Sequence, residues 1–209
     1  FIKNFDINND TENTLSLSVQ NVSDDKYLKL YKIDSRLTDY NTNTLESSLS
    51  FTHEDEDIFF GINTSIFETL SDGYNDKYEY ILPEITIDKN LISDENFGSL
   101  DLQTSYKARI FDTNKLTNFL VNDFNWNFKE INFNSGIKSK FLSTIKNINY
   151  EAKNVDVYKE DTTSEIYGAL GYFSEINLQK KTTNSNHLLK PKMLVRYSPG
   201  SMRKETSGY

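Results

Sequence analysis

The stretch GSLDLQTSYKARIF, residues 98–111, alternates between apolar and polar side chains over almost its whole length. Successive side chains of an extended strand point to opposite faces, so this period of two predicts a β-strand with one apolar and one polar side. The apolar side comprises Leu100, Leu102, Thr104, Tyr106, Ala108 and Ile110. The polar side comprises Asp101, Gln103, Ser105, Lys107, Arg109 and Phe111. At ~3.3 Å per residue the strand would be over ~40 Å long, whereas strands of globular proteins most often have about 5–6 residues.

Strands of the same kind recur along the chain. Long runs occupy residues 58–70, 116–129, 137–151 and 163–178, and shorter alternating segments occupy 15–19, 45–51 and 78–87. Turns rich in Asn, Asp and Gly separate them, for example at 72–76. No segment predicts a convincing helix, and residues 27–33 are interpreted as a weakly alternating strand. The pattern predicts an all-β fold over residues 1–209, an antiparallel up-and-down meander of about ten long strands, as part of a large transmembrane β-barrel.

The segment around Pro191 predicts one further strand. Proline cannot donate a backbone hydrogen bond, so it is expected at the first residue of a strand or on a sheet edge. From Lys192 the residues alternate, with Met193, Val195 and Tyr197 on one face. We therefore predict a half-buried strand directly after Pro191.

Composition excludes several classes of protein. The 209-residue chain has a formal net charge of -8 and no cysteine, which rules out disulfides, thiolate nucleophiles and Cys-based zinc sites. The absence of a basic stripe disfavours nucleic-acid binding. No apolar run approaches the ~20 residues of a membrane-spanning helix, but barrel strands never give such a run. Because the chain begins with Phe1 and has no charged-then-apolar leader, we expect a mature chain or an internal piece of a longer protein.

No combination of residues predicts an enzyme. Motifs for serine hydrolases, zinc proteases and nucleotide binding are absent. His53 lies beside the acidic residues 54–57, which suits a divalent cation, but a solvated turn is the favoured interpretation. We interpret His187 as a surface residue, and we expect no catalytic residue, no metal and no cofactor. Trp126 either packs in a core or belongs to an aromatic girdle at a membrane interface, and the sequence leaves both open.

Four stretches of the chain carry a resemblance to a known family. They are VSDDKYLKLYKIDSRL at 22–37, YEYILPEITI at 78–87, TNFLVNDFNWNF at 117–128 and LLKPKMLVRYSPGSMRKE at 188–205. The last one fits the pattern L-x-P-x-x-x-x-R-Y-x-P on Leu189, Pro191, Arg196, Tyr197 and Pro199. In this order, the stretches resemble the barrel region of the lipopolysaccharide-assembly outer-membrane proteins, also called organic solvent tolerance proteins, of alphaproteobacterial type.

The resemblance implies a function in lipopolysaccharide transport at the bacterial outer membrane. Members of the family form a barrel of about 26 strands, which encloses a plug lipoprotein. Periplasmic bridge proteins supply lipopolysaccharide, which leaves through a lateral gap between the first and last strands. The present chain has room for about ten strands and lacks the periplasmic domain, so we interpret it as an internal barrel segment without gate residues. The implied partners are lipopolysaccharide, the plug lipoprotein and the bridge proteins.

The two faces of residues 98–111 then have different environments. The residues expected to face lipid are Leu100, Leu102, Tyr106 and Ile110, and those expected to line a hydrated lumen are Asp101, Gln103, Lys107 and Arg109. A closed barrel satisfies every backbone polar group inside hydrocarbon, because each strand is bonded to its neighbours. The alternative is a soluble secreted all-β binding module, a sandwich or an adhesin-like domain, whose apolar face would meet another sheet or a helix.

Overall fold

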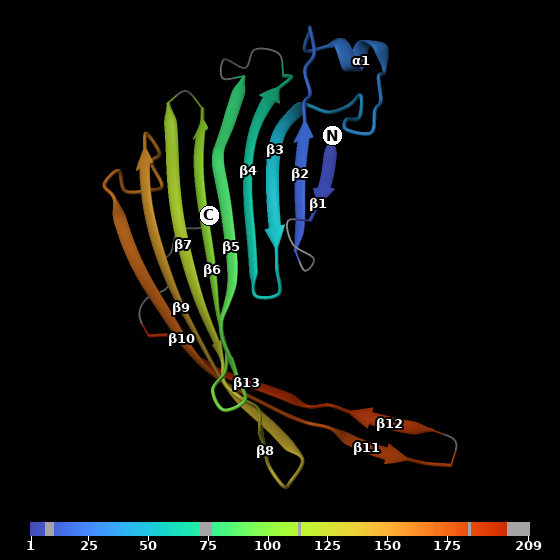
Figure 1. Ribbon diagram of the computed structural model, residues 1–209, viewed down its shortest axis with the longest axis vertical. Helices are drawn as coiled ribbons and strands as arrows, with labels where there is room; N and C mark the ends of the chain where they lie inside the picture. Colours follow the sequence, from blue (N-terminus) through green and yellow to red (C-terminus); the bar gives the residue numbers. More distant parts are fainter. Residues whose placement is uncertain (7–10, 72–76, 113, 184, 200–209) are drawn as a thin grey trace.

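A long, curved antiparallel sheet makes up most of the computed structural model (Figure 1). Residues 1–6, 11–71, 77–112, 114–183 and 185–199 are described, so the turn predicted at 72–76 lies outside them. Ten strands follow one another in the order β1-β2-β3-β4-β5-β6-β7-β9-β10-β13, and β8 pairs only with β9. Strands β11 and β12 form a separate hairpin. The prediction of an all-β, up-and-down antiparallel fold is confirmed.

Most strands of the main sheet are long, as the sequence predicts, and β3 and β5 extend beyond the segments 45–51 and 78–87 that were predicted for them. Strands β3 to β7, β9 and β10 have between 11 and 17 residues each. The bounds are β1 Ile2–Phe5, β2 Glu12–Ser18, β3 Thr44–Glu54, β4 Ile58–Thr69, β5 Tyr78–Asp94, β6 Gly98–Phe111, β7 Lys115–Asn127, β8 Ile131–Asn132, β9 Ile137–Lys153, β10 Thr163–Ile176, β11 Leu178–Lys181, β12 Asn186–Leu189 and β13 Lys192–Tyr197.

Pairing is regular in the centre of the sheet. Strands β6 and β7 stay in continuous register from Ser99 opposite Asn127 to Phe111 opposite Lys115. Strand β5 is less regular, because its register with β6 shifts after Ile81 and again after Asn90. These irregularities divide the 17-residue strand β5 into shorter straight parts and let it bend with the sheet.

A short helix, α1 (Tyr27–Tyr31), occupies the position of the strand predicted over 27–33, so that prediction is wrong. Leu28 is 5% exposed and packs with Leu45 and Leu70 at one end of the sheet, whereas Leu30 is 70% exposed. The helix therefore buries a single leucine. A helix of five residues is too short to show a hydrophobic periodicity, so the sequence pattern did not predict it.

Lys77 joins the segment before α1 to the sheet. Its ammonium nitrogen lies 2.8 Å from a carboxylate oxygen of Asp25 and 2.8 Å from one of Glu68. The hydrogen bonds to Asp25 and to Glu68 raise the pKa of Lys77 well above its ordinary value. Because the pKa is raised in the folded state, the stabilisation is fully present at neutral pH. It is lost only as the pH rises through the folded-state pKa.

The strand after Pro191 is present, but it is not half-buried. All six residues of β13 are exposed. β13 pairs with β10 along one edge, and among the described residues no other element contacts it. Alternation therefore identified the strand correctly but not its burial.

Gly98, at the start of β6, has a backbone conformation that only glycine tolerates there. Its φ is +80°, and a Cβ atom would lie 2.0 Å from the carbonyl oxygen of Asn127. Gly136 has a similar φ of +81°, but a Cβ atom at that position would meet nothing within 4 Å. A substitution at Gly136 would therefore cost backbone strain alone, whereas one at Gly98 would cost the same strain and a steric clash.

We expect Gly98→Ala to lower the free energy of unfolding by at least about 2 kcal/mol, and Gly136→Ala by about 1 kcal/mol, since only the first adds a clash to the strain. Urea unfolding followed by the fluorescence of Trp126 measures both. The Trp126 indole N–H donates to the Phe97 carbonyl oxygen at 2.9 Å, beside the substituted turn. Equal losses for the two variants would contradict this account.

Candidate functional site: a sheet with one apolar and one polar face

The strand register assigns each side chain to one of two faces. Leu102 lies opposite Phe124, which lies opposite Ile145, so apolar side chains continue across β6, β7 and β9. On the other face Gln103 lies opposite Asp123. Directly paired residues share a face, so the separation seen along residues 98–111 extends across neighbouring strands.

Side-chain exposure shows which face is the inside of the curve. On β9, Ile148 and Tyr150 of the polar face are 1% and 2% exposed. Phe141 and Ile145, on the apolar face of the same strand, are both 50% exposed. Side chains converge on the inner side of a curved sheet and diverge on the outer side. We therefore call the polar face the concave face and the apolar face the convex face.

Large apolar side chains cover the convex face. Among the described residues no second sheet packs on it, and α1 covers only one end of it, where Leu28 packs on Leu45. All four residues predicted to face lipid, Leu100, Leu102, Tyr106 and Ile110, belong to this face by register. Exposed members of the face include Leu17, Leu49, Ile66, Ile92, Ile110, Phe124, Trp126, Phe141, Ile145, Ile166, Leu170, Met193, Val195 and Tyr197. A soluble protein rarely leaves so large a continuous apolar surface uncovered.

The apolar residues form a belt that crosses the strands obliquely. One row of paired residues is apolar on the N-terminal strands but polar on the C-terminal ones: Phe51, Ile62, Ile85, Tyr106, Leu120, Asn149 and Ser164. A lower row is mainly apolar on the C-terminal strands: Ile92, Leu100, Trp126, Ser143, Leu170 and Tyr197. On the N-terminal side this lower row reaches the level of the acidic turn at 55–57. There the backbone carbonyl oxygen of Asp57 accepts a hydrogen bond from the backbone N–H of Asn90.

Several polar side chains interrupt the belt, and three of them, Thr104, Asn122 and Asn147, bond to one another. The Thr104 hydroxyl donates to the Asn122 side-chain oxygen at 2.8 Å, and the Asn122 amide donates to Asn147 at 3.5 Å. Asn147 in turn donates to the Ser164 hydroxyl at 3.4 Å. Mutual hydrogen bonding reduces the cost of placing amides in apolar surroundings.

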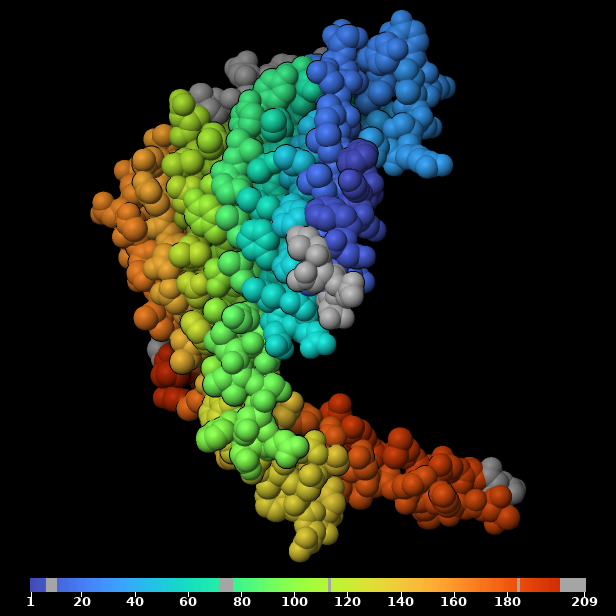
Figure 2. All heavy atoms as spheres, in the orientation of Figure 1, coloured from blue at the N-terminus to red at the C-terminus, as the bar shows by residue number. Residues whose placement is uncertain are grey.

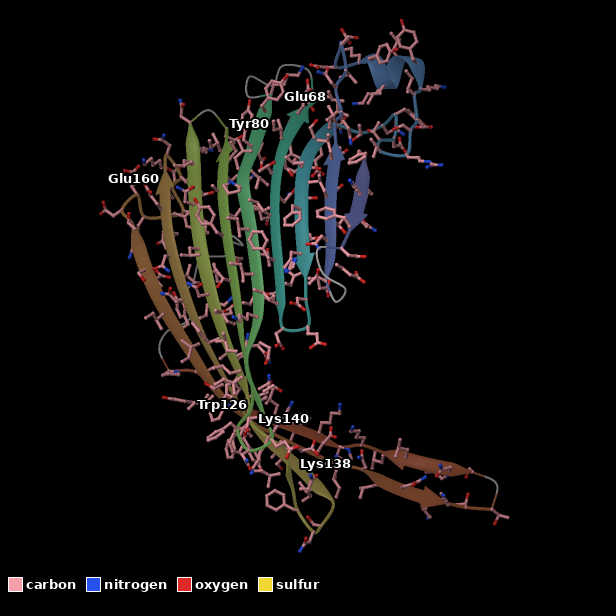
Figure 3. The ribbon with its side chains drawn as sticks, in the orientation of Figure 1. Glu68, Tyr80, Trp126, Lys138, Lys140 and Glu160 are labelled. Carbon is pink, nitrogen blue, oxygen red and sulfur yellow. The ribbon has the colours of Figure 1, made fainter. Side chains whose placement is uncertain are left out.

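Aromatic residues lie toward both ends of the belt (Figure 3). Tyr80 lies near the upper end of β5, with its ring 6.3 Å from that of Tyr78. Trp126 lies toward the lower end of β7, is 37% exposed and contacts Phe128 edge-on. Of the two interpretations of Trp126, packing in a core is therefore not what the structure has.

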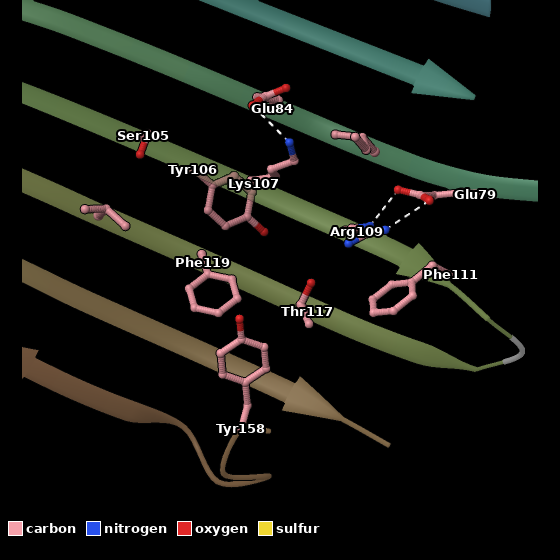
Figure 4. Close-up of a pocket in the computed structure, with 12 residues that line it drawn as sticks. Glu79, Glu84, Ser105, Tyr106, Lys107, Arg109, Phe111, Thr117, Phe119 and Tyr158 are labelled. Carbon is pink, nitrogen blue, oxygen red and sulfur yellow. Dashed lines mark hydrogen bonds and ion pairs between the residues drawn. The ribbon is translucent and has the colours of Figure 1, made fainter. Parts of the chain in front are cut away.

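The concave face carries charged side chains in cross-strand pairs (Figure 4). The Arg109 guanidinium donates to both oxygens of Glu79, at 2.6 and 3.1 Å, and lies 4.1 Å from the centre of the Phe111 ring. Lys107 lies 3.3 Å from Glu84. The predicted lumenal residues Lys107 and Arg109 are thus neutralised by two carboxylates of β5.

An aromatic cluster closes one side of the same region. Tyr158, from the connection between β9 and β10, contacts Phe119 at 5.2 Å and Tyr150 at 5.7 Å between ring centres. Together with the charged pairs, Phe119 and Tyr158 line a cavity of about 350 Å³ on the concave face (Figure 4). The sequence analysis did not find this cavity, because its residues come from β5, β6, β7 and a loop.

The other two predicted lumenal residues lie further down the concave face. The Asp101 carboxylate accepts a hydrogen bond from Asn90 at 2.7 Å. Gln103 is exposed and lies opposite Asp88 on one side and Asp123 on the other. All four predicted lumenal residues therefore share one face but are divided between an upper and a lower group.

The acidic turn at 54–57 does not form a metal site with His53. The His53 side chain is on the convex face, and its Nδ1 lies 2.8 Å from the Asn13 side-chain oxygen. Among the described residues, no group of three His, Asp or Glu side chains could hold a metal ion.

No helix in the described part of the chain is long and apolar enough to cross a membrane. No protein-family model and no curated protein matches the sequence.

The Arg109–Glu79 pair is expected to stabilise the upper concave face. We expect Arg109→Ala to lower the free energy of unfolding by about 1–2 kcal/mol, because a bidentate ion pair and a cation–π contact are lost together. The charge-swapped double variant, Glu79→Arg with Arg109→Glu, should recover part of this loss. Urea unfolding of the single and double variants measures the coupling.

Lys115→Ala is the matched control, since Lys115 forms an exposed pair with Asp112 at 3.3 Å and lies further from the same Phe111 ring, at 5.8 Å from its centre. Its effect should stay below about 0.5 kcal/mol. A loss at Arg109 no larger than that at Lys115 would show that the concave pair contributes nothing beyond an ordinary surface ion pair.

Proposed function

We propose that the chain is a segment of a transmembrane β-barrel in the bacterial outer membrane, with the convex face against lipid and the concave face toward a hydrated lumen. The observation that carries this proposal is the oblique apolar belt. Its centre lies between Leu49 and Phe51 on β3 and near Leu170 on β10, a drift of about seven residues over the six strand-to-strand steps between them.

The drift of the belt supports a barrel geometry. With ~3.3 Å per residue and ~4.8 Å between strands, it corresponds to a strand tilt of about 40° from the normal of the belt. Strands of outer-membrane barrels are tilted by about 35–45°. On β6 the belt runs from Leu100 to Ile110, about 33 Å along the strand and about 25 Å after correction for the tilt. The apolar band of such barrels is about 25 Å tall.

The concave face supports a lumen that accommodates polar material. The charges of its upper part occur in opposite pairs, Arg109 with Glu79 and Lys107 with Glu84, whereas Asp88 and Asp101 add negative charge to its lower part. Both parts are polar enough to be hydrated. The cavity lined by Phe119 and Tyr158 combines flat ring faces with carboxylate, ammonium and guanidinium groups. Such a combination suits a sugar, because the rings contact its C–H face and the polar groups bond its hydroxyls.

We further propose that the barrel belongs to the lipopolysaccharide-assembly translocon and helps to deliver lipopolysaccharide to the outer leaflet. This step rests on the resemblance of residues 22–37, 78–87, 117–128 and 188–205 to that family. The plug lipoprotein and the periplasmic bridge proteins are the partners that the resemblance implies. The role is transport, without catalysis.

A soluble binding module is the weaker alternative. It requires a second layer over the convex face, and among the described residues none is present. Removing from water a surface of this size is the main gain that such a module would need in order to fold.

Neighbouring residues of β6 offer a direct test, because the chain has no native cysteine. In lipid vesicles, we expect Gln103→Cys to react with a charged, membrane-impermeant thiol reagent at least about ten times faster than Leu102→Cys, since lipid shields the convex face. In urea the two rates should become equal, which controls for intrinsic reactivity. Similar rates in vesicles, or a chain that is monomeric and stable in water without detergent, would favour the soluble module.

Photo-crosslinking tests the proposed cargo. A photoreactive amino acid at Phe119, on the concave face, should crosslink to added lipopolysaccharide. The same residue at Ile166, on the convex face and 73% exposed, should crosslink to phospholipid instead. Immunoblotting detects the lipopolysaccharide adduct, and mass spectrometry of the protein detects the phospholipid adduct. A phospholipid adduct at Ile166 without a lipopolysaccharide adduct at Phe119 would support a lipid-facing convex face. It would count against a lumen that carries lipopolysaccharide, and so against the transport role.

A further inference from the structure

The hairpin formed by β11 and β12 is basic in a chain that is acidic as a whole. Residues 175–199 contain five cationic side chains, Lys180, Lys181, Lys190, Lys192 and Arg196, and Glu175 as their single carboxylate. The whole chain has a net charge of -8, so the rest of it carries all of the net negative charge. The hairpin and its base thus have a local net charge of +4, from five cations and one carboxylate, although most of the 23 Lys and Arg residues lie elsewhere in the chain.

This basic hairpin lies directly beyond the lower end of the convex belt. Along β10, Tyr172 belongs to the convex face and is followed by Glu175 and Ile176, and β11 begins at Leu178. On the returning side, Lys192 pairs with Glu175, and Met193 is the first convex residue of β13. Apart from Arg196, which lies opposite Gly171 further up the sheet, the cations therefore start where the apolar belt ends, and Figure 2 shows the hairpin projecting from the main body.

The hairpin is exposed on both faces. Every described residue of β11 and β12 is exposed, and Lys180 lies opposite His187 in the register. Lys190 and Lys192 lie 2.9 and 4.0 Å from oxygens of Glu175, so this carboxylate is shared between two ammonium groups. The remaining cations keep a net positive charge at the base and along the hairpin.

The hairpin also carries apolar side chains that suit a lipid interface. Leu188 is 70% exposed and Leu189 is 62% exposed. Exposing these leucines to water brings no stabilisation. At a lipid interface, leucine side chains bury apolar area among the acyl chains while lysine side chains contact the headgroups. Binding to an acidic protein would explain the lysines, but it would not explain why they lie next to the apolar belt.

We propose that the basic hairpin docks on the phosphate groups of anionic lipids around the barrel and recruits these lipids to this side of it. The inference rests on the proposed membrane function, and it adds which class of lipid the basic hairpin selects. Each cation near an anionic membrane surface contributes roughly a fivefold increase in affinity, and the attraction falls off within about 10 Å.

The single Trp126 reports on the lipid next to the hairpin. It lines one groove of the convex face together with Phe141, Tyr172 and Tyr197, the last of which is on β13. The chain is reconstituted in vesicles of phosphatidylcholine and phosphatidylglycerol, with bromines on the acyl chains of one lipid or the other. We expect brominated phosphatidylglycerol to quench Trp126 as if it were about fivefold enriched over brominated phosphatidylcholine.

Matched variants locate the preference. Lys180→Gln with Lys181→Gln should reduce the enrichment to less than half, and high salt should reduce it in the original chain. Lys32→Gln with Arg36→Gln, two exposed cations at the opposite end of the sheet, should leave it unchanged.

The possible results separate the two proposals. Equal quenching by both brominated lipids, or an enrichment that survives in the Lys180/Lys181 variant, overturns the role of the hairpin alone. The absence of quenching by any brominated lipid overturns the membrane function as well. If soluble polyglutamate abolishes the enrichment at low micromolar concentration while equal amounts of free phosphate do not, the hairpin prefers an acidic polypeptide, and the lipid proposal is wrong.

Discussion

The pairing of backbone groups across ten successive strands is the constraint on which the structure depends. Each interior strand exchanges hydrogen bonds with both neighbours, so its backbone needs nothing from the surroundings. The side chains alone then decide what each face of the sheet meets. One layer of strands with no second layer on it is unusual in water, because the apolar half of its side chains stays exposed.

Curvature gives the two faces different properties. On the concave face side chains approach one another, and long charged residues reach partners on the next strand, as Lys107 reaches Glu84. On the convex face side chains diverge, and even large residues such as Phe141 remain half exposed. Crowding inside and exposure outside are what a barrel wall requires, with hydrated ion pairs toward the lumen and an apolar surface toward the lipid.

The oblique belt connects strand register to the proposed barrel geometry. A belt parallel to the rows of paired residues would fit strands that stand upright. The observed drift instead fits tilted strands, and closure of a sheet into a barrel requires such a tilt. Under the proposed function, the aromatic residues near both ends of the belt and the lysines beyond its lower end would lie at the two lipid interfaces.

The alternation of residues 98–111 was sufficient to predict the strand, its length and the composition of both faces, because the period of two is a local property of extended backbone. The long strands β4, β7, β9 and β10 were predicted for the same reason. Local pattern failed at α1, where one leucine decides the structure by packing against distant residues. It also failed for the burial of β13, since burial depends on what lies beside a strand.

The sequence by itself determined which side chains share a face and that the fold is a meander of long strands. Only the tertiary structure decided which carboxylate neutralises Arg109, how Tyr158 joins Phe119 and where the apolar belt crosses each strand. These features depend on register and curvature. Both are set by hydrogen bonding between segments that are far apart in the chain, and no local pattern of residues records them.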